Sequence, residues 1–468
     1  MASMTLYAPP SPVERARRVS VTATDPLAFT PSIEQAAYEL SRKRFNIIPA
    51  GRRTGKTQIA KRRGVRFALL NTFWPDFRIA YTCPTYAQVK RNYWDDLHRI
   101  INGYEKGLIA DESKTDLMIK LFNGSMIWLI GMDKPDRFEG PSYNWVFADE
   151  APNMKAEAIE QHIFPALSER LGGLDLYGVP EGHNHYYKTA MFAQEIENAD
   201  EWGYYWWRSR DVMPLYLGEE AAAREIERAR RRMDELTFRQ EYEAEFIYFT
   251  GRAYHKFDRE KHAIERLPYD PAAPLHLCFD FNTAPGVAAV IQESREQRGK
   301  DREDCTYIIG QVTISKNSTT PAVCDALAAT WKTHKGPVYC YGDATGGAGG
   351  SAKVRGSDWD LIRQELTPYF GGRLFFRVPT KNPPERARVN AVNSRLESSN
   401  GIVRMKVDPA NAADIATDFD ETTVLDGGAG QIDKKTNKAR SHHSDSVGYY
   451  IVKRHPIDGG YAYRNQAI

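Results

Sequence analysis

Cysteine is scarce in this chain, and its few copies follow no recognisable pattern. Five cysteines occur among 468 residues: Cys83, Cys278, Cys305, Cys324 and Cys340. Their number is odd and no two have C-x-x-C spacing, which argues against a disulfide framework and against a cysteine-based zinc site. This usage is typical of a reducing cytosol, so we expect a cytoplasmic protein.

The chain also lacks long apolar runs and a strong net charge. No apolar stretch approaches the ~18 residues that a membrane-spanning helix needs, and the N-terminal residues lack the apolar centre of a signal peptide. We therefore expect no membrane contact. Because the formal net charge is only +2, any nucleic-acid contact must rely on local basic patches. The segment Leu40–Arg66 is such a patch, with ten Lys and Arg residues and no acid, although part of it fits the solvated face of a helix.

Alternating strand-like and helix-like patterns divide the chain into two α/β regions. The first covers residues 30–250 and the second covers residues 274–455, with a linker at 251–273 where mixed charges and prolines interrupt the pattern. Residues 1–29 are expected to form a flexible arm, and residues 456–468 a flexible tail.

Several apolar runs predict the strands of these two regions. In the first region they are Phe45–Pro49, Arg78–Cys83, Ser125–Ile130, Trp145–Ala148 and Leu174–Gly178. In the second they are Leu275–Phe281, Val287–Gln292, Thr306–Ser315, Val338–Tyr341 and Leu374–Val378. The charged stretch Glu219–Glu245 predicts a helix, whose arginines fit a solvated face better than a phosphate contact, and Gly346–Gly350 predicts a mobile loop.

A phosphate-binding loop is the most informative motif in the chain. Residues 50–57 read Ala-Gly-Arg-Arg-Thr-Gly-Lys-Thr and fit G-x-x-x-x-G-K-[ST] with Ala in the first place. Consecutive backbone N–H groups would cradle phosphate oxygens, Lys56 would bridge the terminal phosphates, and the Thr57 hydroxyl would bind Mg²⁺. The residues expected to hold the nucleotide are Gly51, Arg52, Arg53, Thr54, Gly55, Lys56 and Thr57. The alternative is a glycine-containing turn before an ordinary basic helix.

An acidic pair downstream strengthens the nucleotide hypothesis. The apolar run Trp145–Ala148 delivers Asp149 to the sphere of the Mg²⁺ ion, and Glu150 could then polarise a water for attack on the γ-phosphate. An Asp-Glu pair after an apolar run is common by chance. Combined with Lys56-Thr57 in the same region, it predicts ATP hydrolysis with Mg²⁺.

Three further positions have weaker signals. Gln35 could read the adenine edge, or it could be an ordinary surface glutamine. Arg52 or Arg53 could sense the γ-phosphate, with Arg52 the candidate catalytic residue and the other exposed. Arg137, in Asp-Arg-Phe-Glu-Gly, is a candidate arginine finger for a neighbouring subunit.

Three aspartates predict a metal site in the second region. Asp280 and Asp343 each end an apolar strand, and Asp445 opens an apparent helix. Clustered carboxylates can hold two divalent ions about 4 Å apart that activate water and stabilise the leaving oxygen of a phosphodiester. Hard oxygen ligands favour Mg²⁺ or Mn²⁺ over zinc. Singly, each aspartate fits an ordinary strand end or helix cap. His442 and His443 beside Asp445 could assist, although surface histidines are the simpler interpretation.

These motifs, in this order, resemble the large terminase subunit of tailed bacteriophages. The resemblance covers Phe29–Val452 and includes the segments around Gln35, Arg137 and Asp149. Residues 179–187 (Val-Pro-Glu-Gly-His-Asn-His-Tyr-Tyr) are similar to the family's coupling motif, which links hydrolysis to DNA movement. Phe279–Asn282, Gly342-Asp343 and Ser444-Asp445 match its ribonuclease-H-like nuclease. Two departures are Gly178-Val179, where Ser or Thr is frequent, and Ser446, where another Asp often stands.

The resemblance implies an α/β protein with an N-terminal P-loop ATPase domain of the ASCE or RecA-like type and a ribonuclease-H-like nuclease domain. It implies an ATP-driven motor that threads double-stranded DNA into a procapsid and cuts concatemeric DNA, with Mn²⁺ able to replace Mg²⁺ in the nuclease. The implied partners are the portal protein, a small terminase subunit that selects the DNA, and further copies of this chain. Those copies would form a ring of five on the portal, although the chain can be monomeric in solution. The implied location is the host cell cytoplasm.

Two other classes share part of this pattern. A helicase or repair ATPase fused to a nuclease would have the same motifs, but it usually needs a second RecA-like domain, and the chain has one phosphate-loop region. A non-enzymatic DNA-binding scaffold would have decayed sites, whereas Lys56, Thr57, Asp149 and Glu150 are intact. Because the sequence has no recognition helix or zinc module to read base edges, cleavage is expected to tolerate many sequences.

Overall fold

The computed structural model describes most of the chain. The described residues are 30–281, 285–298, 301–315, 318–344, 357–426, 430–436, 440–457 and 463–466. The predicted arm at 1–29, the Gly346–Gly350 loop, Asn282 and residues 458–462 and 467–468 of the predicted tail lie outside them. The prediction of a flexible tail was wrong for Tyr463–Gln466, because these residues pair with a neighbouring strand. The chain divides into two compact units, residues 1–226 with 239–247 and residues 227–238 with 248–468.

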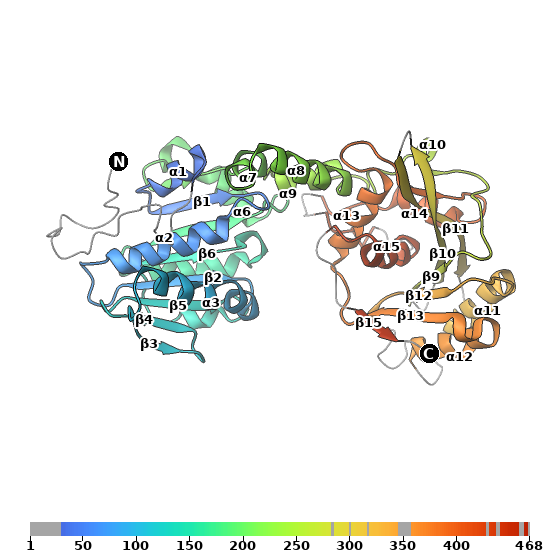
Figure 1. Cartoon of the computed structure of the whole chain (residues 1–468), viewed down its shortest axis with the longest axis horizontal. Helices are drawn as coiled ribbons and strands as arrows, with labels where there is room; N and C mark the ends of the chain where they lie inside the picture. Colours follow the sequence, from blue (N-terminus) through green and yellow to red (C-terminus); the bar gives the residue numbers. More distant parts are fainter. Residues whose placement is uncertain are drawn as a thin grey trace. The chain divides into compact units, whose positions relative to one another are not determined.

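The first unit is built on an eight-stranded sheet (Figure 1). Its strand order is β3-β4-β5-β2-β6-β7-β1-β8. The strands are β1 (Phe45–Pro49), β2 (Arg78–Cys83), β3 (Ile109–Ser113), β4 (Met118–Leu121), β5 (Met126–Gly131), β6 (Trp145–Ala148), β7 (Gly173–Gly178) and β8 (Trp202–Tyr204). Only the β3-β4 and β4-β5 pairs are antiparallel, so the carboxyl ends of the other strands meet at one edge of the sheet.

Helices cover this sheet and connect its strands. They are α1 (Ile33–Glu39), α2 (Lys56–Leu70), α3 (Tyr86–Tyr104), α4 (Ala156–Ala158), α5 (Phe164–Ser168), α6 (His185–Phe192) and α7 (Ser209–Leu217). Short 3-10 turns are η1 (Pro135–Phe138), η2 (Ala151–Asn153) and η4 (Ile196–Asn198), and η3 (Ile159–Ile163) is a π-helical turn. The strand residues of β1 are all buried, as expected for a strand inside a parallel sheet covered on both faces.

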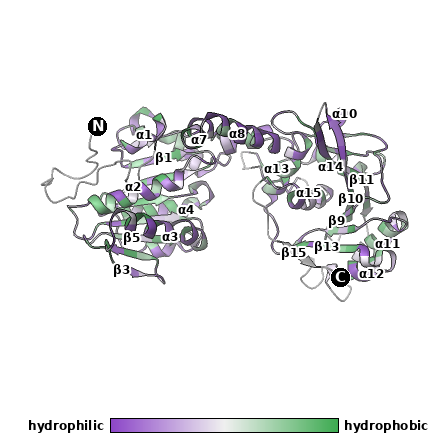
Figure 2. Cartoon of the chain, in the orientation of Figure 1, coloured by the Kyte–Doolittle hydropathy of each residue, from purple (hydrophilic) through white to green (hydrophobic). Residues whose placement is uncertain are grey.

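The predicted helix over Glu219–Glu245 is two helices, α8 (Glu219–Arg232) and α9 (Glu235–Tyr242). The helical character predicted for this stretch is confirmed, and Asp234 divides it: its Oδ1 accepts hydrogen bonds from the backbone N–H groups of Leu236 and Thr237 at the start of the second helix. Figure 2 shows α8 as predominantly hydrophilic, in keeping with its run of Glu and Arg.

The second unit contains a seven-stranded mixed sheet of order β14-β11-β10-β9-β12-β13-β15 (Figure 1). The strands are β9 (Leu275–Asp280), β10 (Gly286–Arg298), β11 (Asp301–Ile314), β12 (Val338–Tyr341), β13 (Leu374–Pro379), β14 (Met405–Val407) and β15 (Tyr463–Gln466). The helices, with one of the 3-10 turns, are α10 (Arg259–His262), α11 (Thr320–Trp331), α12 (Asp358–Phe370), η6 (Gly371–Arg373), α13 (Glu385–Leu396), α14 (Ala413–Glu421) and α15 (His442–Arg454). The meander β9-β10-β11 is antiparallel, and β12 and β13 then continue parallel to β9.

The α/β prediction is confirmed, and most predicted strands lie where they were expected, within one or two residues. The exceptions are β10 and β11, which are longer than predicted because their outer halves form a polar hairpin. All five cysteines are free and buried. In the ranges described above, no helix combines the length and the apolarity required to cross a bilayer.

The basic segment Leu40–Arg66 is not simply a solvated helix face. Lys61 and Arg63 of α2 are buried, at 2% and 1% exposure. Lys61 donates to Asp96 at 2.6 Å, and the Arg63 guanidinium lies 3.4 Å from Asp175 on β7. Part of this positive charge therefore holds α2 against its neighbours and is not available to bind nucleic acid.

Candidate functional site

The phosphate loop joins β1 to α2. Pro49 ends β1, and α2 begins at Lys56, with Gly55 in the left-handed region (φ 73°) as its N-cap. Arg53 is also left-handed (φ 63°). Successive N–H groups with such alternating backbone angles form a concave anion-binding nest, and the α2 N-terminus adds its positive dipole. The loop therefore has the backbone form that phosphate binding needs.

Four predicted residues meet at the mouth of this loop. The Lys56 Nζ lies 3.3 Å from Glu150 Oε1, and the Thr57 hydroxyl donates to Asp149 Oδ2 at 2.7 Å. Burial disfavours the charge on Lys56, but the nearby carboxylates of Glu150 and Asp149 outweigh this effect and raise its pKa. Lys56 is therefore a fixed cation at the place where a γ-phosphate would lie.

Asp149 is held from a second side by a residue that the sequence did not reveal. The Tyr93 hydroxyl, from α3, donates to Asp149 Oδ2 at 3.0 Å. Asp149 Oδ1 accepts the backbone N–H of Glu150 at 3.1 Å. Glu150 itself has φ 58°, a conformation that costs energy for a residue with a side chain and that is concentrated at functional sites.

The two loop arginines do not share one environment. Arg52 Nε donates to Glu241 Oε2 at 2.6 Å, and its backbone N–H donates to the Glu241 carbonyl at 2.7 Å. The carbonyl of Arg53 accepts a hydrogen bond from the Tyr216 hydroxyl at 2.9 Å. The γ-phosphate sensor role of Arg52 stays a prediction, and α9 and α7 supply loop partners that the sequence analysis missed.

Position 51 requires glycine, because its backbone lies against α7 and α9 with no room for a side chain. A Cβ atom at this position would lie 2.7 Å from the Tyr242 carbonyl oxygen and 2.8 Å from Ser209 Oγ. Ser209 Oγ also donates to the Arg52 carbonyl at 2.6 Å. The loop is therefore packed tightly against α7 and α9 on the side away from α2.

Gln35 is buried, at 2% exposure, so the surface interpretation was wrong. Its Oε1 accepts the Ser32 N–H at 3.0 Å, and its Nε2 donates to the Thr54 carbonyl at 2.8 Å. The first bond is half of a capping box at the start of α1. Gln35 therefore contacts the phosphate loop directly, whereas its reading of adenine stays a prediction.

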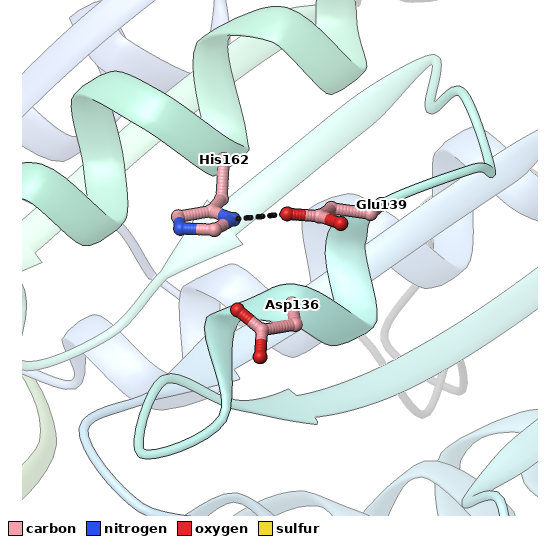
Figure 3. A group of neighbouring side chains, drawn as sticks. All are labelled: Asp136, Glu139 and His162. Carbon is pink, nitrogen blue, oxygen red and sulfur yellow. Dashed lines mark ion pairs between the residues drawn. The ribbon is translucent and has the colours of Figure 1, made fainter.

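Arg137 lies on the exposed η1 turn, over the ring of Tyr86 (5.4 Å to the centroid). Its flanking residues Asp136 and Glu139 gather with His162 so that one ligand atom from each lies within 4.8 Å of the others. Figure 3 shows His162 facing Glu139, with Nδ1 3.6 Å from Oε1. The exposure of Arg137 is compatible with a role in a neighbouring subunit, which stays a prediction.

The predicted coupling segment contacts the chain just after Glu150. Asn184 caps α6 by accepting the N–H groups of Tyr186 and Tyr187, and its Nδ2 donates to the Pro152 carbonyl at 3.0 Å. The His185 Nε2 lies 3.2 Å from the Ala151 carbonyl. Asn184 and His185 thus touch the acidic loop.

In the second unit, Asp280 and Asp343 lie at the same end of adjacent strands. β9 ends at Asp280, and β12 runs parallel beside it, ending at Tyr341 two residues before Asp343. α15 starts at His442, whose Nδ1 lies 3.1 Å from Asp280 Oδ2, so Asp445 is in the first turn of that helix. Asp280 and Asp343 therefore lie at one end of the sheet, and α15 brings His442 and the turn that holds Asp445 to the same end; their role as metal ligands stays a prediction.

The three carboxylates do not form one tight cluster: no choice of one oxygen from each places all three within 4.8 Å of one another. Burial raises the pKa of Asp280, and the negative charges of Asp445 and Asp343 raise it further against the opposing bond from His442. Oxygen donors on neighbouring strand ends fit a hard divalent ion. Asp280 and Asp343 would hold it most directly.

Both oxygens of Asp445 are already paired with cations. Arg388 Nη2, from α13, donates to Oδ1 at 2.8 Å, and the Lys434 Nζ lies 3.4 Å from Oδ2. Arg388 is buried, whereas the side chain of Lys434 is 57% exposed. Neither cation was found from the sequence, because both come from segments with no motif. The assignment of Asp445 as the third ligand stays a prediction.

The histidine interpretation needs correction. His443 is buried and lies 2.8 Å from the Thr313 hydroxyl, and His442 is partly buried against Asp280, so neither is a surface histidine. Asp418, also missed, accepts the N–H groups of His443 and Ser444. Burial raises the pKa of Asp418 to about 6.

Comparison with known proteins agrees with this arrangement. No protein-family model matches the chain. The large terminase subunit of Escherichia phage T5 is 28% identical over 229 residues, which are 48% of this chain and 49% of that protein. The chain thus matches about half the length of this curated relative. The predicted resemblance to large terminase subunits is confirmed.

Solved structures extend the likeness in fold to most of the chain. The large terminase of a thermophilic bacteriophage superposes with a TM-score of 0.62 at 16% identity, covering 90% of this chain and 98% of that one. The same phage protein in complex with ADP gives a TM-score of 0.62 over 91% of this chain. The predicted α/β fold, with two successive α/β domains as in a large terminase, is confirmed.

Proposed function

We propose that the chain is the large subunit of a terminase, which hydrolyses ATP to move double-stranded DNA and cuts that DNA with a separate nuclease site. The observation that carries the proposal is that one chain holds a complete phosphate-loop site in its first unit and converging aspartates at the sheet end of its second. A large terminase of known structure shares this fold over 90% of the chain.

In the proposed ATPase site each residue has one task. The loop N–H groups and Lys56 bind the β- and γ-phosphates, and Thr57 and Asp149 hold the Mg²⁺ ion that accompanies ATP. Glu150 accepts a proton from the attacking water. Asn184 and His185, which touch the residues after Glu150, transmit its movement to α6.

In the proposed nuclease site Asp280 and Asp343 are the principal ligands of Mg²⁺ or Mn²⁺, with Asp445 as the third. The ions, when bound, would activate water and stabilise the leaving oxygen of a phosphodiester. Arg388 fixes the carboxylate of Asp445, and His442 orients that of Asp280.

The proposed partners follow from the resemblance. They are double-stranded DNA, a small terminase subunit, the portal protein of a procapsid, and further copies of this chain in a ring on that portal. Arg137 would then reach the nucleotide of the next subunit. The proposed location is the cytoplasm of the infected host cell.

The test is to assay the purified chain for DNA-stimulated ATP turnover and, in parallel, for plasmid cleavage with Mn²⁺. We expect both activities, and we expect each to survive loss of the other site. Robust unwinding of a forked duplex by the lone chain would favour a helicase fused to a nuclease instead. Absence of both activities would overturn the proposal.

A further inference from the structure

A cavity of about 160 Å³ lies in the first unit at the C-terminal end of α2, the opposite end from the phosphate loop. Its walls include the aromatic rings of Phe67, Trp74, Phe77 and Trp145. Glu39 at the end of α1 and Arg66 on α2 also line it. A cavity of this size accommodates a single benzene-sized ring, since an apolar cavity of about 150 Å³ binds benzene.

Two buried polar atoms of the lining lack a partner among the described residues. Arg66 Nη2 donates to Glu39 Oε2, but the second bond of a two-pronged pair is not made. Glu39 Oε1 and Arg66 Nε are both buried and have no hydrogen-bond partner among the described residues. The Glu39 side chain as a whole is only 7% exposed. A buried acceptor and donor left unpaired are costly, so a ligand that satisfied both would be strongly favoured.

The charges around the cavity are balanced. Glu39 is paired with Arg66, Arg63 with Asp175, and Arg170 with Asp76. A ligand with a net charge would therefore bring a charge into a site without a counterion. The lining favours a neutral aromatic ring with one group that both donates and accepts a hydrogen bond.

A phenol has these properties. Its hydroxyl can donate to Glu39 Oε1 and accept from Arg66 Nε while its ring fills the aromatic space. We propose that this cavity binds the phenol ring of a tyrosine side chain presented by a protein partner. This site is separate from the nucleotide and nuclease sites of the proposed function and does not depend on them.

The rim of the cavity indicates that the ring belongs to a larger molecule. Phe73 and Leu171 line the cavity with 64% and 76% of their surfaces exposed. Leu171 also has φ 51°, an unfavourable conformation for a leucine, and its apolar side chain is in solvent. A pocket with polar atoms at its base and apolar residues at its opening suits tyrosine, which buries its ring and bonds through its hydroxyl at protein interfaces.

The experiment compares small probes on the full chain. p-Cresol, toluene, N-acetyl-tyrosinamide and N-acetyl-phenylalaninamide are titrated, and binding is followed by ligand-observed NMR. We expect p-cresol to bind at least tenfold more tightly than toluene, and the tyrosinamide more tightly than p-cresol because its backbone contacts the rim. Glu39→Gln should weaken the preference for p-cresol, because a neutral amide oxygen is a weaker acceptor than a carboxylate, whereas Glu34→Gln, which alters an exposed acid on the same helix, should not.

Each other outcome overturns the proposal. Equal binding of toluene and p-cresol would make the cavity merely apolar. Tighter binding of p-cresol than of N-acetyl-tyrosinamide would indicate a free phenolic compound and not a partner protein. If neither p-cresol nor N-acetyl-tyrosinamide binds at millimolar concentration, Glu39 and Arg66 satisfy each other's hydrogen bonds without a ligand. The comparison of the probes uses the unaltered chain. It therefore tests the proposed tyrosine site even if the Glu39→Gln variant does not fold.

Discussion

The Nζ of Lys56 lies 3.3 Å from Oε1 of Glu150, so two groups to which we assign different tasks in the proposed ATP hydrolysis form an ion pair with each other. The cation would bind the terminal phosphates, and the carboxylate would accept a proton from water. These tasks are separable by substitution. Glu150→Gln should retain nucleotide binding, because Lys56 and the loop N–H groups remain.

We expect Glu150→Gln to lower ATP turnover by about 10²- to 10⁴-fold, the usual contribution of a general base. Lys56→Ala should lose nucleotide binding as well as turnover. Fluorescent-nucleotide titration and phosphate release measure the two effects. Lys155→Ala, which removes an exposed lysine nearby, should behave like the parent chain. Turnover at the parental rate in Glu150→Gln would show that another residue is the base.

Asp280→Asn and Asp343→Asn should each abolish Mn²⁺-dependent plasmid cleavage, because each removes a carboxylate at the strand ends where the metal is expected. ATP turnover should not change, since neither residue belongs to the first unit. Asp304→Asn alters an exposed acid of the second unit and serves as the control. Normal cutting by both site variants would exclude the assigned metal cluster.

Lys434→Ala should strengthen Mn²⁺ binding. The side chain of Lys434 is 57% exposed and lies 3.4 Å from Asp445 Oδ2, so it competes with a metal ion for this oxygen. A pair with such an exposed cation is worth about 0.2–1 kcal/mol, which corresponds to a gain of roughly 1.4- to fivefold in affinity. Mn²⁺ titration followed by EPR measures the effect, with the neighbouring Lys435→Ala as control. Weaker binding in Lys434→Ala would mean that this lysine supports the site.

Gly178→Ala should destabilise the first unit and lower ATP turnover. A Cβ atom at this position would lie 2.0 Å from Pro152 Cδ, two residues after Glu150. Overpacking of this kind costs about 1–3 kcal/mol and would displace the acidic loop. Urea unfolding and phosphate release measure the two effects. Gly372→Ala, with no atom within 4 Å of the added Cβ, should leave both unchanged.

The second unit should lose stability in acid through Glu293. Burial opposes its charge, but hydrogen bonds from His455 and Tyr450 and the charge of Arg395 lower its pKa to about 2. Since this folded-state pKa lies below the ordinary value near 4.5, the charged form favours folding. The contribution, on the order of 3 kcal/mol, is complete above pH 4.5 and is lost as the pH falls towards 2.

Glu293→Gln checks this expectation. The difference in unfolding free energy between the parent chain and the variant should be largest at pH 7 and should shrink between pH 4.5 and 3. Glu296→Gln, which alters a carboxylate of the same strand that is paired with Lys406, should give a smaller difference. A gap that stays constant with pH would show that the effect comes from packing alone.

The sequence was sufficient where function depends on a short local pattern. The loop around Lys56, the strand that delivers Asp149 and the strand end at Asp280 were all located from apolar runs followed by specific residues. Such positions are set by backbone direction, because a buried strand in a parallel sheet ends at the edge where its neighbours end. The same reasoning placed Asp343 beside Asp280.

The sequence was insufficient where a partner comes from a segment without a motif. Tyr93, Glu241 and Arg388 contact Asp149, Arg52 and Asp445, but each lies on a helix with no local signal of that contact. Gln35 was assigned from its position before the loop, yet its burial depends on how α1 packs. These relationships are tertiary, and only coordinates reveal them.

The buried ion pair between Arg63 and Asp175 joins helix α2 to strand β7. Because the guanidinium of Arg63 is buried midway along α2 and lies 3.4 Å from Asp175 of β7, sliding or rotation of α2 on the sheet would separate a buried ion pair. Under the proposed function, α2 would therefore stay fixed when the cleaved phosphate leaves. The turn after β6 and helix α6, which touch through Asn184 and Pro152, would then be the first parts to move.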